Sequence, residues 1–187
     1  MPARTRTPTS RSALLIIDMI GPLDFPDGGR LLGQALPVAK RIARLKARLK
    51  AAGVPAIYVN DNFGHWQHGF RELVAICSED GVRGAPLARL LAPGAEDWSV
   101  LKPQHSAFYN TPLEALLREH GIGRVLLTGV AGEHCILASA LDAKMRKLEV
   151  VVVRDAVASV TAERNRRALA VLRSLRIELT TASRVQG

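Results

Sequence analysis

The stretch Ala13-Leu-Leu-Ile-Ile-Asp18 decides the fold class, because it is apolar throughout and ends on a carboxylate. A strand with one wet face alternates apolar and polar residues. A strand of a parallel sheet is covered on both faces and is apolar along its whole length. We therefore predict that residues 13–18 form a buried strand of a parallel sheet.

Similar apolar runs recur along the chain, separated by stretches with helical periodicity. The further strands are expected at 55–60, 98–101, 124–128, 149–153 and 176–180, and the helices at 30–52, 70–77, 112–120, 133–147 and 161–174. This alternation predicts a three-layer α/β/α fold with a doubly wound, mostly parallel, Rossmann-like sheet of six strands. In such folds ligands bind beyond the carboxyl ends of the strands. The residues that follow the strands are therefore the site candidates, namely Asp18, Asp61, Lys102, 129–135 and Asp155.

Length and composition indicate one globular unit. The chain has 187 residues, which suits a single domain, expected at 12–187. Residues 1–11 are expected to form a disordered basic tail, which lacks the amphipathic pattern of a transit peptide. No apolar run approaches the roughly 20 residues that span a bilayer, and two cysteines imply no disulfide framework. We expect a cytoplasmic protein without a membrane partner.

The net charge of +9 raises the question of nucleic acid. The basic residues of 40–50 interleave with Val38, Ile42, Leu45 and Leu49, whose spacing is that of an amphipathic helix with a basic wet face. The arginines of 164–173 have a similar arrangement. No aromatic residues interleave with either cluster, so a stacking platform for single strands is missing. We expect a solvated basic surface and no specific nucleic-acid partner.

A candidate nucleophile lies in Gly129-Val-Ala-Gly-Glu-His-Cys135, which follows one expected strand and opens a helix. Amides at the start of a helix point near such a sulfur and favour the thiolate, and they can receive a developing oxyanion. Position alone leaves two readings open, a reactive thiol and a buried structural cysteine. The Gly-x-x-Gly spacing does not match a dinucleotide-binding fingerprint.

Two further charged residues complete a constellation. Asp18 is either a general base at the sheet edge or a loop cap. In a doubly wound order the first and fourth strands are neighbours, so Asp18 and Cys135 can face each other. The third strand lies two positions from the first, about 10 Å away. Lys102 therefore reaches the site only if its segment curls inward.

Four segments in register resemble the isochorismatase-like cysteine hydrolases: 13–19, Lys102-Pro-Gln-His-Ser-Ala-Phe108, 129–135 and Val153-Arg-Asp-Ala-Val-Ala-Ser159. The resemblance runs from about residue 12 to 182. It implies Cys135 as nucleophile, Asp18 as general base and Lys102 as the cation that holds the thiolate. It also implies an oxyanion hole of the Ala131 and Cys135 amides, with a cis peptide before Ala131.

The same resemblance implies an enzyme that hydrolyses a C–N bond of a small amide without a cofactor, and we expect it to form a homo-oligomer. Two alternatives remain. Isochorismatases proper act on a vinyl ether and generally lack the cysteine, so Cys135 argues against that reaction. A non-catalytic α/β binding protein with a retained fold would be expected to lose at least one of Asp18, Lys102 and Cys135.

Several positions depart from the family pattern. The segment Asp18-Met-Ile-Gly-Pro-Leu-Asp-Phe25 is longer than its family counterpart, and Gly132 replaces a threonine whose hydroxyl would brace the loop. Nicotinamidases of this superfamily hold a metal near the second strand. Here Asp61, His65 and His68 could bind zinc, but Phe63 occupies the expected position of another histidine, so we predict no metal site.

The remaining candidates are apolar. Phe25, Trp66 and Phe108 are expected to line the substrate pocket, although each could equally belong to the core. Cys77 shares a helical face with Leu73 and is expected in the core.

Overall fold

The computed structural model describes residues 10–64 and 66–186 and contains one parallel sheet of six strands. The strands are β1 (Ser12–Ile17), β2 (Ala56–Asp61), β3 (Trp98–Lys102), β4 (Arg124–Val130), β5 (Glu149–Ala158) and β6 (Glu178–Thr180). Their order is β3-β2-β1-β4-β5-β6, and every neighbouring pair is parallel. The predicted fold class is confirmed, and the order reverses between β1 and β4.

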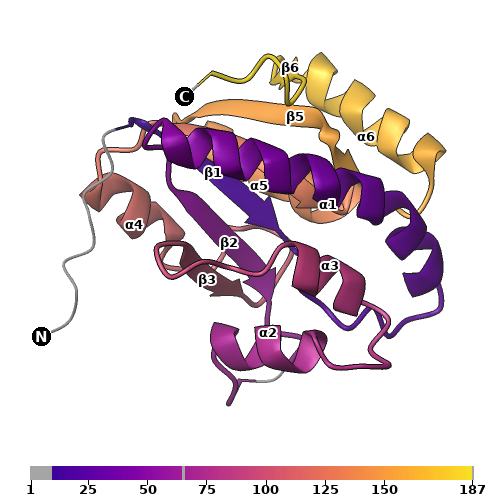
Figure 1. The fold of residues 1–187 in the computed structure, drawn as a ribbon. Coiled ribbons are helices and arrows are strands. Elements are labelled where there is room, and N and C mark those ends of the chain that lie inside the picture. Colours follow the sequence, from indigo (N-terminus) through magenta and orange to yellow (C-terminus); the bar gives the residue numbers. More distant parts are fainter. Residues whose placement is uncertain (1–9, 65, 187) are drawn as a thin grey trace, which may run out of the picture.

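Helices cover both faces of the sheet and give three layers (Figure 1). The helices are α1 (Gly28–Ala51), α2 (Phe70–Cys77), α3 (Ala85–Leu90), α4 (Leu113–Glu119), α5 (Leu137–Met145) and α6 (Ala162–Ser174), with a π-helical turn η1 (Gly132–Ile136) before α5. One core cluster contains the buried residues of α1, α2 and α3, and the other contains those of α4, α5 and α6. No helix in the described residues is long and apolar enough to cross a membrane.

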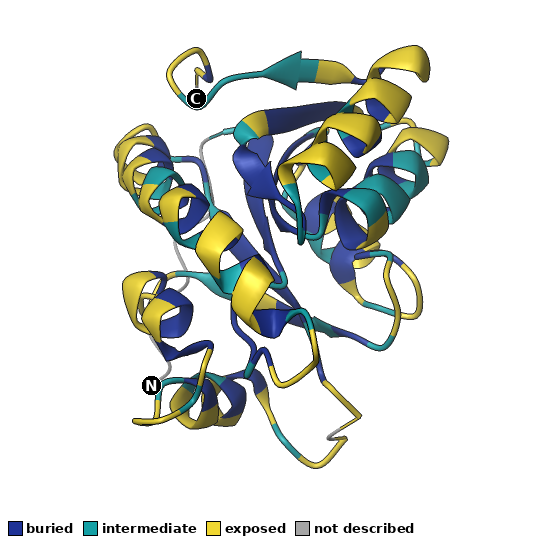
Figure 2. Cartoon of the chain, turned by 90° about the vertical axis from the view of Figure 1, so that its right-hand side faces the viewer, coloured by how far each residue is buried: buried dark blue, intermediate teal, exposed yellow. Residues whose placement is uncertain are grey.

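The apolar stripe predicted for residues 38–49 explains how α1 packs. Val38, Ile42, Leu45 and Leu49 are all buried against the sheet, and each fully buried aliphatic side chain contributes about 1.5–3 kcal/mol. Gly53, at a φ of 76°, ends the helix in the left-handed conformation expected of it. Figure 2 shows the result, with buried strands in the centre and exposed residues on the outer faces of the helices.

Three local predictions need correction. The stretch 133–147 is not one regular helix, because it begins with the wider π turn η1, a feature often found at functional sites. Helix α3 was not predicted, since its six residues are too few to show a clear period. Strand β5 continues to Ala158, so Asp155 lies within it and not after it.

The N-terminal prediction falls largely on residues 1–9, which lie outside the described part of the chain. At the end of the expected tail, the Arg11 carbonyl accepts hydrogen bonds from the amides of Gly123 and Arg124. This contact holds the entry to β1 beside the entry to β4.

The carboxyl ends of β1 and β4 pair directly with each other. Ile17 pairs with Gly129, which has a φ of 115°. A β-carbon at Gly129 would lie 2.0 Å from the Ile17 carbonyl oxygen. Only glycine fits here, both for its positive φ and for this close approach. The loop after β4 therefore starts directly beside the residue after β1, which is Asp18.

Candidate active site

Asp18, Lys102 and Cys135 meet at the carboxyl edge of the sheet. The Lys102 Nζ lies 2.8 Å from Asp18 Oδ2 and 3.5 Å from Cys135 Sγ. The side chain of Lys102 is fully buried, although β3 is separated from β1 by β2. Asp61, at the end of β2, completes the cluster: its amide donates to Asp18 Oδ1 at 2.8 Å, and its Oδ2 lies 3.9 Å from Lys102 Nζ.

The lysine reaches inward because the loop after β3 folds back onto α5. Lys102 Nζ donates to the Gln104 carbonyl at 3.1 Å. Farther along, the Ala107 amide donates to Ser139 Oγ at 2.9 Å, and the Ser106 hydroxyl donates to Asp142. Ser139 and Asp142 are three residues apart on α5 and share one helix face. This helix face holds the segment after Lys102 in the inward curl that the sequence alone could not decide.

Burial and charge set the protonation of the cluster. Burial raises the pKa of Asp18, and the neighbouring Lys102 only partly opposes this. Burial and the Asp18 charge raise the pKa of Cys135 to about 12, again against Lys102. Burial disfavours the cation of Lys102, but Asp18, Cys135 and Asp61 outweigh it and raise its pKa. Burial and the charge of Asp18 thus work against the thiolate that the helix start alone suggested, and Lys102 works in its favour.

The loop that carries Cys135 is held by hydrogen bonds of its own backbone and by close packing at Gly132. Its Val130–Ala131 peptide is cis, as the family resemblance implies, and the Ala131 carbonyl accepts from His134 and Ile136 amides at 3.1 and 3.2 Å. A β-carbon at Gly132 would lie 2.7 Å from Asn165 Oδ1 and 2.9 Å from Ser159 Oγ. Polar side chains thus occupy the space at Gly132, which explains why this chain lacks the threonine.

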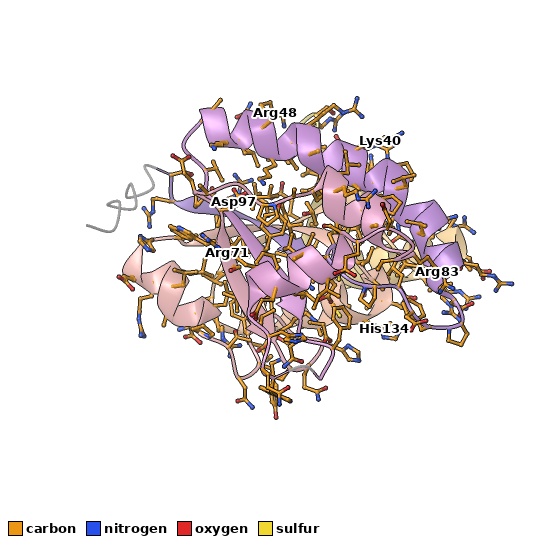
Figure 3. The ribbon with its side chains drawn as sticks, turned by 60° about the horizontal axis from the view of Figure 1, so that its bottom comes forward. Lys40, Arg48, Arg71, Arg83, Asp97 and His134 are labelled. Carbon is orange, nitrogen blue, oxygen red and sulfur yellow. The ribbon has the colours of Figure 1, made fainter. Side chains whose placement is uncertain are left out.

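One residue that contacts Cys135 was not predicted from the sequence. The Nδ1 atom of His105 lies 3.6 Å from Cys135 Sγ. The His105 ring stacks on that of His134, with centroids 5.3 Å apart and an interplanar angle of 21°. Both histidines are exposed. Figure 3 shows His134 on the side of the molecule toward which the ends of β1 and β2 point. The signal was the position of His105, three residues after Lys102 in the matched segment.

The three aromatic residues expected around a pocket differ in their exposure to solvent. Phe108 is buried and packs beneath the Arg146 guanidinium, 5.0 Å from the ring centroid. Phe25 and Trp66 are 42% and 76% exposed. The prediction that Cys77 belongs to the core is confirmed, because its side chain is fully buried, and this burial raises its thiol pKa to about 11.

Asp61, one of the three residues considered as zinc ligands, is engaged by other groups. Asp61 Oδ1 accepts the amide of Phe63 at 2.6 Å, and its other oxygen faces Lys102. Among the described residues, no three His, Cys, Asp or Glu side chains are close enough together to hold a metal ion. His65 lies outside the described residues.

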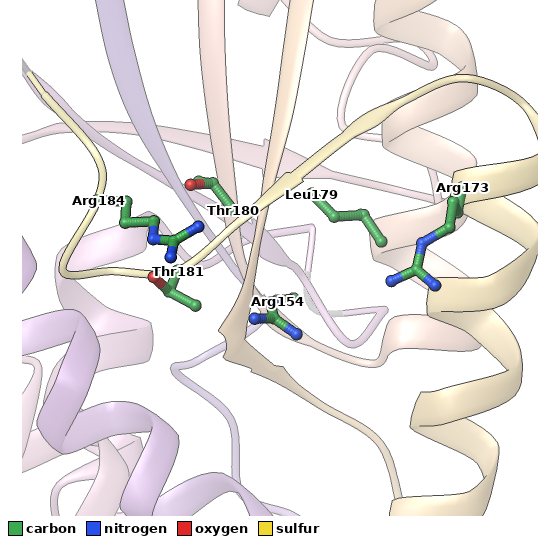
Figure 4. Close-up of a pocket in the computed structure, with 6 residues that line it drawn as sticks. All are labelled: Arg154, Arg173, Leu179, Thr180, Thr181 and Arg184. Carbon is green, nitrogen blue, oxygen red and sulfur yellow. The ribbon is translucent and has the colours of Figure 1, made fainter.

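A hollow of about 330 Å³ lies beside the edge strand β6. It is lined by Arg154, Arg173, Leu179, Thr180, Thr181 and Arg184 (Figure 4). It contains none of the clustered residues described above. Asp155, also a candidate from the sequence, accepts the Ala182 amide at 2.8 Å. Its carboxylate therefore braces the turn after β6 and is not part of the cluster around Cys135.

Comparison with known proteins shows the family of this chain. The Isochorismatase domain family matches residues 12–184. The uncharacterized isochorismatase family protein YaaI of Bacillus subtilis is 34% identical over 174 residues, covering 92% of this chain and 95% of that protein. Maleamate amidohydrolase of Pseudomonas putida is 30% identical over 155 residues, covering 79% and 72%.

A solved structure shares the fold at lower sequence similarity. The isochorismatase-like hydrolase from Alkaliphilus metalliredigens has a TM-score of 0.75 at 22% identity, covering 94% of this chain and 95% of that one. The family match spans nearly all of the described residues, including the three that meet at the sheet edge. The chain therefore belongs to the isochorismatase family and is a hydrolase.

Proposed function

We propose that the protein is a cysteine hydrolase that cleaves the C–N bond of a small amide through Cys135, Asp18 and Lys102. The observation that carries this proposal is the buried Lys102 ammonium, which contacts both Asp18 (2.8 Å) and Cys135 (3.5 Å). This is the arrangement of a nucleophile, its base and an orienting cation. The name of the related maleamate amidohydrolase supports an amide as the substrate class.

The first half-reaction begins with the protonated thiol. Asp18, which contacts the same Lys102 ammonium as the thiol, takes the thiol proton as the sulfur attacks the carbonyl carbon. The S–H bond breaks, and an O–H bond and a C–S bond form. Lys102 stabilises the negative charge on sulfur during this transfer. The amides of Ala131 and Cys135 are the donors proposed for the oxyanion.

Collapse of the tetrahedral intermediate begins the second half of the cycle. The C–N bond breaks as the protonated Asp18 gives its proton to the leaving nitrogen, which leaves a thioester on Cys135. Asp18 then takes a proton from water, and the hydroxide adds to the thioester. The acid is released as the C–S bond breaks, and Asp18 returns the proton taken from water to the Cys135 sulfur. The raised pKa of Asp18 brings its proton affinity closer to what this shuttle requires.

The test is a panel of small primary amides scored for ammonia release. The wild type and a Cys77→Ser control, whose changed side chain lies in the core at the end of α2, should both release ammonia. Cys135→Ser should lose this activity. Ammonia release that survives in folded Cys135→Ser, or none from any amide with the folded wild type, would contradict the proposal.

Metal independence belongs to the same proposal. Exhaustive chelation should leave ammonia release unchanged, because Asp61 is already engaged by Phe63 and Lys102. Loss of activity that zinc restores would instead assign a site to Asp61, His65 and His68. The proposal retains the expected single domain, cytoplasmic location and homo-oligomeric state, and light scattering tests the last of these.

A further inference from the structure

We propose that His105 is a second proton carrier of this site, exchanging a proton with Cys135 from a position more exposed than the buried Asp18–Lys102 pair. The inference rests on the proposed cysteine chemistry and deepens it. Its basis is the 3.6 Å approach of His105 Nδ1 to Cys135 Sγ, within the range of a hydrogen bond to sulfur. Because Nδ1 touches the reacting atom, His105 is assigned as a catalytic residue.

The two neighbours of the sulfur differ in their access to water. Lys102 is fully buried, and the side chain of Asp18 is 12% exposed. His105 is exposed, so a proton taken from the sulfur can pass on to solvent or to a leaving group at the mouth of the site. Imidazole is the side chain that exchanges protons near neutral pH. The charged or titratable groups around this proton are Asp18, Asp61, Lys102, Cys135 and His134.

The proton transfer balances without any further reactant. Neutral His105, with its proton on Nε2, accepts the thiol proton at Nδ1 as the sulfur attacks the carbonyl carbon. The S–H bond breaks and an N–H bond forms. When the C–N bond breaks, the imidazolium returns that proton to the leaving nitrogen. Asp18 and His105 are thus parallel routes, one buried and one facing solvent.

His134 acts through His105 and is a positioning residue. The stacked rings, 5.3 Å apart at 21°, restrict the orientation of the His105 imidazole, which points its Nδ1 at the sulfur. His134 comes from η1, the same turn that carries Cys135. Movement of the nucleophile loop and of the imidazole is therefore coupled, which keeps the contact between His105 and Cys135 in register.

The experiment measures the rate at which iodoacetamide alkylates Cys135 at neutral pH, mapped by peptide mass spectrometry. Asp18→Asn removes the buried route. Adding His105→Asn to that variant should slow alkylation about tenfold, because less thiolate forms. Adding His120→Asn instead is the matched control, since His120 packs against Trp98 outside the cluster, and should leave the rate unchanged. Equal rates in all three folded proteins would overturn the proposal.

Chemical rescue distinguishes proton transfer from a structural role. His105→Ala should lower kcat for amide hydrolysis by less than the roughly hundredfold loss of a sole general acid–base, because the Asp18 route remains, and free imidazole should restore part of the loss at the exposed position. A full loss that imidazole does not restore, with unchanged alkylation, would assign His105 a structural role only. If alkylation depends on His105 but no amide is hydrolysed, the proposed substrate class fails and this inference stands. If Cys135-dependent hydrolysis persists unchanged in His105→Ala, the proposed function stands and the inference about His105 fails.

Discussion

Replacing Lys102 by methionine removes the buried cation while keeping an unbranched side chain of similar length. The fully buried ammonium lies 2.8 Å from Asp18, and breaking a buried pair by removing one partner costs about 3–5 kcal/mol. Asp18 can limit this loss by taking up a proton. Protonating a carboxyl group whose pKa in the unfolded chain is about 3.9 costs about 4 kcal/mol at pH 7. We therefore expect Lys102→Met to lose about 3–4 kcal/mol of unfolding free energy at neutral pH.

The pH dependence of this loss has a definite sign. Burial raises the pKa of Asp18 in the folded protein, and without Lys102 that pKa is raised further. A carboxyl group whose pKa is higher in the folded than in the unfolded protein destabilises the fold. This penalty is complete at a pH above the folded-state pKa, and it disappears as the pH falls to the unfolded-state pKa. The difference between Lys102→Met and the wild type should therefore shrink in mildly acidic solution.

Urea unfolding of matched variants measures these quantities. Lys50→Met is the control, because its partner Glu96 is 3.1 Å away and both side chains are mostly exposed, so it should change stability by about 0–1 kcal/mol. Adding Asp18→Asn to Lys102→Met should recover much of the loss, since no buried charge is then left unpaired. A Lys102→Met loss no larger than that of Lys50→Met, or one independent of pH, would refute this reasoning.

Three further predictions follow from the same geometry. Because burial raises the pKa of Asp18, kcat/KM should fall as the pH drops through that raised value. An acid limb at the ordinary carboxyl value of about 3.9 would contradict this. Gly132→Thr should lose about 1–3 kcal/mol through overpacking against Asn165 and Ser159, and Asn165→Ala should recover part of it in urea unfolding. Unchanged stability would show that this space is free. An oligonucleotide should bind weakly and dissociate at physiological salt, as measured by fluorescence anisotropy, whereas tight binding that persists would reveal a nucleic-acid site on the basic helices.

The fold could be predicted because its information is local. An apolar run such as residues 13–17 is compatible with a sheet covered on both faces, and the helix over 28–51 shows its buried stripe directly in the spacing. Where the signal is short or mixed, prediction fails for a physical reason. Helix α3 has only six residues, and the end of β5 is interrupted by Arg154 and Asp155, which end the apolar run.

The cluster at the sheet edge was only partly predictable. Asp18 and Cys135 follow neighbouring strands, so topology brings them together. Lys102 was reached through the family resemblance, because its approach depends on hydrogen bonds from the following loop to Ser139 and Asp142 on α5. His105 was missed because the same curl, and no local pattern, brings it to a cysteine 30 residues later in the chain.

The most direct test of the account is whether an acyl group becomes attached to Cys135 during turnover. An amide that releases ammonia would be mixed with the enzyme, quenched rapidly in acid and digested for mass spectrometry. We expect a thioester of the expected mass on the peptide that contains Cys135 and none on the peptide that contains Cys77. Steady turnover with no adduct, together with retained activity in Cys135→Ser, would show that the thiol is not the nucleophile.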